Sequence, residues 1–336
     1  MNKKKLPLQV IGKISKTQWG KAGLILVFSI ALLLLPNAIK SNYVMRVIDV
    51  AGIFIIVTIG FNILFGLTGL VSFGQAGFMA IGAYTLAITT TYYNWNPTLG
   101  FLLAMVTSTL AGLIIGFPTL RLKGRYLVIA TTGFGEIVRQ VTLNWKSFTG
   151  GYDGVRVPYF SLLGVIFKGD RAIYYVILFF VIVCFLAANQ IKKSTYGRAM
   201  MAIRDSETAA EVMGINSTRV KMLSFAVSAL FAGLGGALYA HLFRFISPDA
   251  FDARISMNVV GMLLVGGLGS NLGATIGAVI LTALPELVRM GDKFYMVIYG
   301  IIFMSIVVFV PGGIVGSIQT ARKKNKARTK ISHPLK

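Results

Sequence analysis

Long apolar runs constrain the fold of this chain more than any other feature of its sequence. About 20 consecutive apolar residues are needed for a helix to cross a membrane. Charged residues make up only 13% of the 336 residues, well below the roughly 25% of an ordinary soluble domain. The clear candidate spans are residues 22–38, 47–67, 74–93, 98–118, 172–190, 220–242 and 294–315. The sequence therefore predicts an all-α polytopic membrane protein.

Two further segments predict additional helices. Residues 126–145 are apolar but carry Glu136 and Arg139, and the run 257–288 is interrupted by GGLGSNLG, which would divide it into two short helices. Counting every candidate gives about ten spans. About eight spans with re-entrant pieces would also give an even number.

Basic residues at both ends account for much of the net charge of +22. Lysines precede the first apolar run in residues 1–21, and lysines and arginines follow the last in residues 316–336. The positive-inside rule places both segments in the cytoplasm of a bacterial cell, with residues 22–315 forming the permease domain in the plasma membrane. Anionic lipid headgroups are the natural partner of this charge, and nucleic acid is not expected.

A long polar segment separates two of the apolar runs. Residues 191–219 include the sequence AIRDSETAAEVMGI, which predicts a charged helix in a cytoplasmic loop. Lipid cannot satisfy these ionised groups, so the segment favours a docking surface for a soluble partner. A solvated amphipathic helix without a partner is the alternative.

The sequence contains no pattern that indicates an enzyme, a metal site or a cofactor. Cys184 is the single cysteine, and His241 and His333 have no Cys, Asp or Glu cluster at ligand spacing. No GxxxxGK[ST] phosphate loop is present. Any ATP must therefore be hydrolysed by another subunit.

Glycine is dense in two tracts, GLTGLVSFGQAGFMAIGAY from residue 66 and residues 261–277. Small residues at three- or four-residue spacing allow helices to approach closely in lipid. The two tracts also predict an internal repeat of the kind that transporters contain. Glycine-rich packing without any repeat is the alternative.

Several blocks of the chain resemble one known family. GLTGLVSFGQAGFMAIGAYTLA, LRLKGRYLVIATTGFGEIVRQVTLNWKSFTGGYDGV and YGRAMMAIRDSETAAEVMGINSTRVKMLSFAVSALFAGLGGALYA, in that order, are similar to membrane permeases of branched-chain amino acid ABC importers, of the M type. The resemblance extends over residues 47–313. It implies a second, similar permease subunit, two cytoplasmic ATPase subunits and an extracytoplasmic substrate-binding protein as partners.

The resemblance also implies a role for the polar segment. Permeases of ABC importers carry a cytoplasmic coupling helix with an EAA-type pattern, followed by a glycine at the turn. The matching stretch has Thr208 where glutamate is usual, which puts contacts inferred from other importers in doubt. Ala209, Ala210 and Met213 would form an apolar ridge. The expected ATPase-coupling residues are Arg204, Asp205, Glu207, Thr208, Ala209, Ala210, Glu211, Met213 and Gly214.

Candidates for the translocation path come from polar residues within the apolar runs. Glu136 and Arg139 are three residues apart, so they share a helix face and can pair, either beside the path or as a structural ion pair. Further candidates are Ser72, Gln75, Thr131 and Thr132. Hydrogen bonding between helices is the alternative for each of them.

The predicted external loop, residues 146–171, contains a glycine-rich stretch at Thr149–Gly154. Its turns and exposed backbone would suit contact with a substrate-binding protein, and a plain glycine-rich loop fits equally well.

The favoured function is import of leucine, isoleucine and valine. A permease for urea or short amides is the nearest alternative. An ion-coupled secondary transporter is an alternative of another class, and it would need a membrane-embedded ion site and no docking helix.

Overall fold

The computed structural model describes residues 35–36, 39, 41–119, 122, 124–162, 165–166, 169–289, 300–301, 304 and 313–317. The chain divides into two compact units, residues 1–45 and 46–336. The candidate site lies wholly within the second unit, and so do the contacts discussed below.

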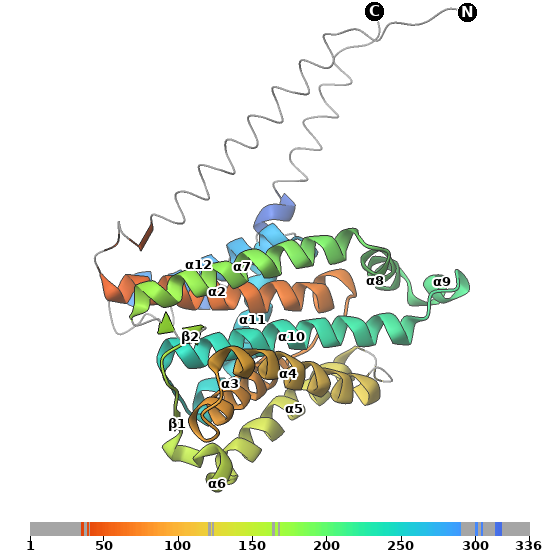
Figure 1. Cartoon of the computed structure of the whole chain (residues 1–336). Helices are drawn as coiled ribbons and strands as arrows, with labels where there is room; N and C mark the ends of the chain where they lie inside the picture. Colours follow the sequence, from red (N-terminus) through yellow and green to blue (C-terminus); the bar gives the residue numbers. More distant parts are fainter. Residues whose placement is uncertain are drawn as a thin grey trace, which may run out of the picture. The chain divides into compact units, whose positions relative to one another are not determined.

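The described residues are mainly helical (Figure 1). The principal helices are α2 (Asn42–Phe61), which continues into the π-helix η1 (Asn62–Leu67), α3 (Gln75–Thr91), α4 (Pro97–Thr119), α5 (Arg125–Asn144), α7 (Asp170–Lys193), α8 (Thr195–Asp205), α9 (Glu207–Val212), α10 (Ser217–Phe243), α11 (Ala253–Gly266) and α12 (Asn271–Arg289).

Short elements connect these helices, and they modify the prediction of a purely α-helical chain. They are α6 (Lys146–Thr149), the 3₁₀ turns η2 (Gly151–Asp153) and η3 (Pro248–Phe251), and the two-residue strands β1 (Val155–Arg156), β2 (Ser161–Leu162), β3 (Val165–Ile166) and β4 (Phe245–Ile246). β1 pairs with β4 and β2 with β3, both antiparallel.

Within the described part of the chain, 4 helices are long and apolar enough to cross a membrane: Asn42–Leu67, Pro97–Thr119, Arg171–Lys193 and Ser217–Phe243. The break expected within residues 257–288 is confirmed, since α11 ends at Gly266 and α12 begins at Asn271. The first and last predicted spans, 22–38 and 294–315, lie largely outside the described residues. The total of about ten spans therefore stays a prediction.

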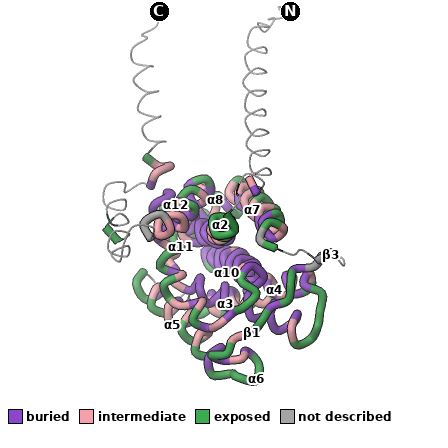
Figure 2. Tube along the Cα trace, turned by 90° about the vertical axis from the view of Figure 1, so that its left-hand side faces the viewer, coloured by how far each residue is buried: buried purple, intermediate pink, exposed green. Residues whose placement is uncertain are grey.

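Helix α10 is the buried centre of the bundle, with α3 and α4 packed on it (Figure 2). Glycine makes this packing close. A Cβ atom added to Gly236 would lie 1.9 Å from the carbonyl oxygen of Met79, and one added to Gly82 would lie 2.1 Å from that of Gly233. The predicted close approach of small-residue helix faces is confirmed at these positions.

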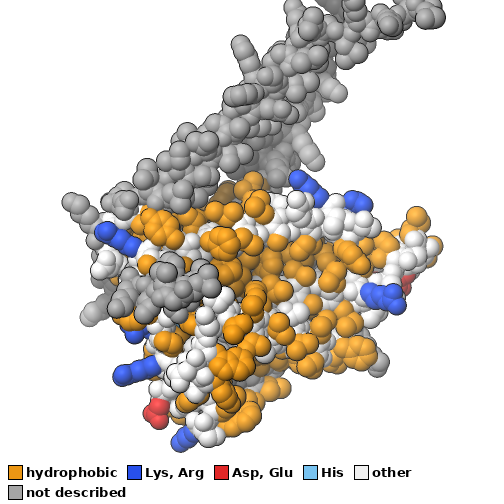
Figure 3. Space-filling view, viewed as in Figure 1, with side chains coloured by type: hydrophobic (Ala, Val, Ile, Leu, Met, Phe, Trp, Pro, Cys, Tyr) orange, Lys and Arg blue, Asp and Glu red, His pale blue; other side chains and the backbone are white. Residues whose placement is uncertain are grey.

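The bundle has an apolar middle between two charged ends on the face seen in Figure 3. Helix α4 contributes exposed apolar side chains at helical spacing, namely Leu99, Leu102, Val106, Leu110, Ile114 and Phe117. We call the end that carries α8 and α9 the α9 end, and the opposite one, with β1 and α6, the β1 end (Figure 1).

Candidate functional site

At the α9 end, helices α8 and α9 form an elbow between α7 and α10, which we define as residues 194–216. Each helix begins at a capping side chain. The hydroxyl of Ser194 accepts a hydrogen bond from the backbone N–H of Gly197, that of Ser206 from Ala209, and the side chain of Asn216 from Arg219. Such caps satisfy donors at the helix start and fix the elbow's bends locally.

The elbow turns back toward α10 at Gly214. This residue has a φ of +82°, a conformation that strongly favours glycine. The N–H of Gly214 donates to the carbonyl of Glu211, and the N–H of Ile215 donates to that of Ala210. The turn predicted at Gly214 is present, and the coupling role of α9 stays a prediction.

The tip of the elbow exposes apolar side chains. Val212 is 83% exposed and Met213 is 81% exposed, and Ala209 is exposed beside them. The prediction of an exposed ridge was wrong for Ala210, which is only 3% exposed. Because the inward face of α9 lies toward α8 and the start of α10, it takes Ala210, and the apolar surface shifts to Val212 and Met213.

The charged residues of the elbow make contacts within the chain. Glu207 pairs with Lys221 in the first turns of α10. The hydroxyl of Ser217 lies 3.2 Å from a carboxylate oxygen of Glu207 and 2.6 Å from one of Glu211. These contacts attach α9 to the start of α10.

The remaining predicted elbow residues are Arg204, Asp205 and Thr208. Arg204 reaches inward, where its Nη1 donates to the carbonyl oxygen of Gly66 at 2.5 Å. Asp205 and Thr208 are exposed. Arg204 is exposed as well, so all three side chains remain candidates for contact with a partner.

Ser72, Gln75 and Thr131 are fully buried. They hold together the irregular stretch 68–74 that precedes α3. Thr131 accepts a hydrogen bond from the N–H of Phe73, and Ser72 accepts one from Gly74. Gln75 donates to Ser228 of α10 at 3.1 Å. Each of these side chains therefore has a hydrogen-bond partner within the chain, and a role in the translocation path stays a prediction.

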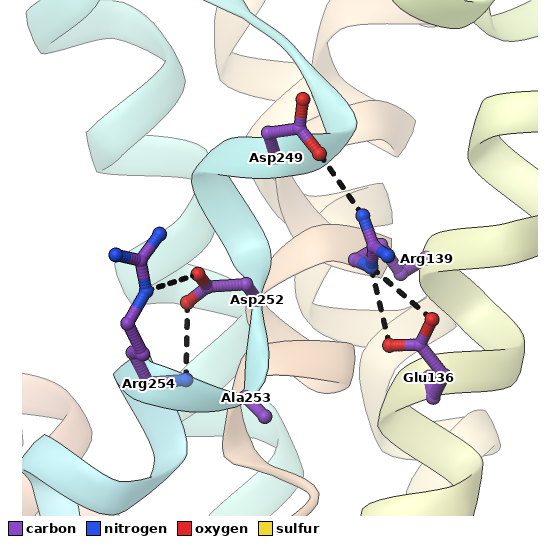
Figure 4. Close-up of a pocket in the computed structure, with 6 residues that line it drawn as sticks. All are labelled: Glu136, Arg139, Asp249, Asp252, Ala253 and Arg254. Carbon is purple, nitrogen blue, oxygen red and sulfur yellow. Dashed lines mark hydrogen bonds and ion pairs between the residues drawn. The ribbon is translucent and has the colours of Figure 1, made fainter.

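Glu136 and Arg139 lie near the β1 end of α5 and do pair, with Arg139 Nε 3.1 Å from a carboxylate oxygen of Glu136. Arg139 also reaches Asp249 at 2.9 Å, and Arg254 pairs with Asp252 at 2.5 Å (Figure 4). Together with Ala253 these residues line an open pocket of about 510 Å³.

Asp249, Asp252 and Arg254 were not anticipated from the sequence. Asp249 is 110 positions from Arg139 along the chain. Sequence spacing alone therefore could not predict the contact between them. The signal available was SPDAFDAR, a charged stretch directly after an apolar run.

Helix α5 carries a polar face that leads toward this pocket. Glu136 and Gln140 are exposed and hydrogen-bonded to each other, and Thr132 lies one turn earlier on the same face. Gly133 has no atom within 4 Å of an added Cβ. The same exposed side of α5 also carries the apolar side chains of Ile129, Ile137 and Val141, so the polar face is a stripe between apolar residues.

The chain was compared with known proteins. A family model described as the permease component of branched-chain amino acid transport systems matches residues 43–309. The chain is 34% identical over 330 residues to the high-affinity branched-chain amino acid transport system permease protein LivM of Salmonella typhimurium, covering 90% of this chain and 78% of that protein.

Other relatives extend this set. LivM of Escherichia coli is 34% identical over 314 residues, with 85% of this chain and 74% of that protein covered. The autoinducer 2 import system permease protein LsrC of Escherichia coli is 26% identical over 246 residues, with 68% of each covered. No solved structure matches the chain.

The apolar helices and these matches define a multi-pass membrane permease, a transport subunit and not a catalytic one. The chain belongs to the family of permease components of branched-chain amino acid transport systems.

Proposed function

We propose that this chain is one of two similar permease subunits of an ATP-driven importer for leucine, isoleucine and valine. Two cytoplasmic ATPase subunits drive the importer and dock through the α9 end, and an extracytoplasmic binding protein delivers substrate at the β1 end. The chain crosses the bacterial plasma membrane about ten times, with both termini in the cytoplasm.

The exposed apolar tip of the elbow carries this proposal. Val212 and Met213 are more than four-fifths exposed in an otherwise polar segment. Apolar side chains that project from a capped, short helix are suited to fill a pocket on a partner. The neighbouring Asp205 and Thr208 supply a polar rim.

The attachment of α9 to α10 gives the elbow a mechanical role. The contacts of Glu207 and Glu211 with Ser217 and Lys221 join the docking helix to the first turns of α10. Since α10 is the buried centre of the bundle, movement of the ATPase subunits passes directly into the helices that pack on it.

The polar face of α5 supports a water-accessible route toward the β1 end. Glu136 is 48% exposed, and a charged side chain in contact with lipid is costly. The face therefore borders the path or the second permease subunit. A zwitterionic amino acid carries an ammonium and a carboxylate group. These groups can briefly replace Arg139 and Glu136 as each other's ion-pair partners, so the substrate binds without being trapped.

The glycine-rich stretch Thr149–Gly154 lies at the same end as this pocket. Gly150, Gly151 and Gly154 have positive φ angles, and the side chain of Tyr152 is 72% exposed. A tight turn that presents an exposed aromatic side chain suits contact with the binding protein.

The test is assembly of the importer with Val212→Asp and Met213→Asp introduced together. Both side chains are exposed, so the change should leave the permease folded. Substitution of buried Ala210 would not separate docking from folding. We expect loss of ATPase association in co-purification and loss of ATP-driven leucine uptake in liposomes.

Tyr152→Ser is the matched control for association, because Tyr152 is also exposed but lies at the β1 end. It should co-purify with the ATPase subunits as the wild type does. Association that survives the double substitution contradicts the docking proposal. Uptake that depends on an ion gradient and not on ATP would favour a secondary transporter.

A further inference from the structure

The end of one helix meets the break between two others close to the elbow. The π-helix η1 ends at Leu67, and the turn between α11 and α12, residues 267–270, lies against it. A Cβ added to Gly66 would lie 2.6 Å from the backbone nitrogen of Gly269. We call this contact the junction.

Asparagine side chains join the two halves of the junction. Asn62 of η1 accepts a hydrogen bond from the N–H of Gly269 at 2.8 Å and donates to the side chain of Asn271 at 2.8 Å. Asn271 in turn donates to Asn189 of α7 at 3.0 Å. Asn62 is fully buried and Asn271 is 4% exposed, so these bonds lie in the interior of the protein.

Two cations close the junction from outside. Lys192, in the last turn of α7, donates to the carbonyl oxygen of Gly269 at 2.5 Å. Arg204, in the last turn of α8, donates to the carbonyl oxygen of Gly66 at 2.5 Å. Gly66 lies in the last turn of η1, where carbonyls lack an intrahelical donor and carry partial negative charge that a cation offsets. Gly269 lies in the turn between α11 and α12, and Lys192 gives its carbonyl a charged donor.

Lys192 lies just before the docking elbow, and Arg204 lies within it. Glycine leaves room for them. A Cβ on Gly69, whose φ is +80°, would approach the Cγ of Arg204 to 3.1 Å, and one on Gly269 would approach its Nη1 to 3.2 Å. The guanidinium therefore lies against both halves of the junction.

A neighbouring arginine provides the contrast. Arg198, also on α8, hydrogen-bonds to the carbonyl of Lys193 and the hydroxyl of Thr195, both local to the start of its own helix. Arg198 carries the same charge as Arg204 and lies on the same helix. Among the described residues it makes no hydrogen bond to η1 or to the turn after α11.

We propose that Arg204 and Lys192 are positioning residues that couple the elbow to the junction of η1 with the α11–α12 turn. When the ATPase subunits displace the elbow, the two cations leave the carbonyls of Gly66 and Gly269, and η1 separates from the turn after α11. This inference rests on the proposed ATP-driven function. It assigns Arg204 an internal role and not a contact with the ATPase subunits.

The first experiment compares Arg204→Met, Arg204→Lys and Arg198→Met in the assembled importer in liposomes. Methionine keeps the apolar stem and removes the charge. We expect Arg204→Met to bind the ATPase subunits normally but to lower leucine uptake per ATP hydrolysed by at least about fivefold. Arg204→Lys should restore part of the ratio, and Arg198→Met should match the wild type.

An unchanged ratio of uptake to ATP hydrolysis in Arg204→Met would overturn the proposal. Loss of ATPase association in the same variant would also overturn it, because Arg204 would then be a docking residue. If the wild type itself does not assemble with the ATPase subunits, the proposed function fails, and the second experiment still tests the junction.

The second experiment needs only the purified full-length chain. Hydrogen exchange of the peptides covering residues 62–69 and 262–273 should be at least about fivefold faster in Arg204→Met than in Arg198→Met. In Arg204→Met, η1 loses the hydrogen bond at Gly66, and the turn loses the guanidinium that lies against Gly269. Equal exchange in the two variants would show that Arg204 does not hold the junction.

Discussion

Glycine is frequent in two contacts of the molecule, that of α3 with α10 and the junction of η1 with the α11–α12 turn. Its role differs between them. In the first, Gly82 and Gly236 lie within regular helices and let two backbones touch. In the second, Gly267 and Gly269 have positive φ angles and reverse the chain. The first contact is made by backbone packing, and the second is held by asparagine amides and two cations. Close packing suits a rigid scaffold, and a polar contact can open when its charges move.

The largest effect is expected for Gly236→Leu in the helix contact. Its first side-chain atom would already lie 1.9 Å from the carbonyl oxygen of Met79. Forced overpacking costs about 1–3 kcal/mol or more, and here the clash is with backbone, which cannot move aside. We expect little monodisperse protein in detergent by size-exclusion chromatography.

Gly133→Leu is the control for that change, because a Cβ at Gly133 meets no atom within 4 Å. It should elute as the wild type does. If both variants are equally well folded, α3 and α10 do not require the close contact that the structure describes.

An intermediate effect is expected for Asn62→Leu in the junction. The substitution leaves the buried N–H of Gly269 and the amide of Asn271 without their partner. An unsatisfied buried polar group costs about 1–3 kcal/mol. The midpoint of thermal unfolding in detergent should fall in Asn62→Leu. Asn144→Leu, at an exposed position, should change this midpoint little. Equal midpoints for the two variants would count against a polar junction.

The smallest effect is expected for the hydrogen bond between Gln75 and Ser228, which joins α3 to α10. A double-mutant cycle of Gln75→Leu and Ser228→Ala should give a coupling energy of about 0.6 kcal/mol, the average for such bonds in membrane proteins. Gln75→Leu should then leave leucine uptake per folded molecule unchanged. A selective loss of uptake would instead favour the path role predicted from the sequence.

Regular features of the fold were predictable because each follows from local pattern. Apolar length predicted α4, α7 and α10, and the glycines of GGLGSNLG predicted the break between α11 and α12. The turn at Gly214 was predictable because glycine readily adopts its positive φ angle.

The features that were missed depend on contacts distant in sequence. The contact predicted between Arg204 and a partner stays a prediction, but nothing in its sequence neighbourhood indicates its hydrogen bond to Gly66. Likewise the inward orientation of Ala210 depends on how α9 lies on the bundle, and the pocket combines α5 with residues more than 100 positions away. Local periodicity carries no information about such pairings.

The polar face of α5 also has a consequence for biogenesis. Glu136, Arg139 and Gln140 lie on one helix, and charged residues make insertion of an isolated segment by the translocon unfavourable. Partners for this helix are synthesised much later, since Asp249 pairs with Arg139 only after α10 has emerged from the ribosome. We therefore expect α5, whose place as a membrane span stays a prediction, to pack stably only late in assembly, and a nascent chain truncated before α10 should leave this helix exposed to membrane quality-control proteases.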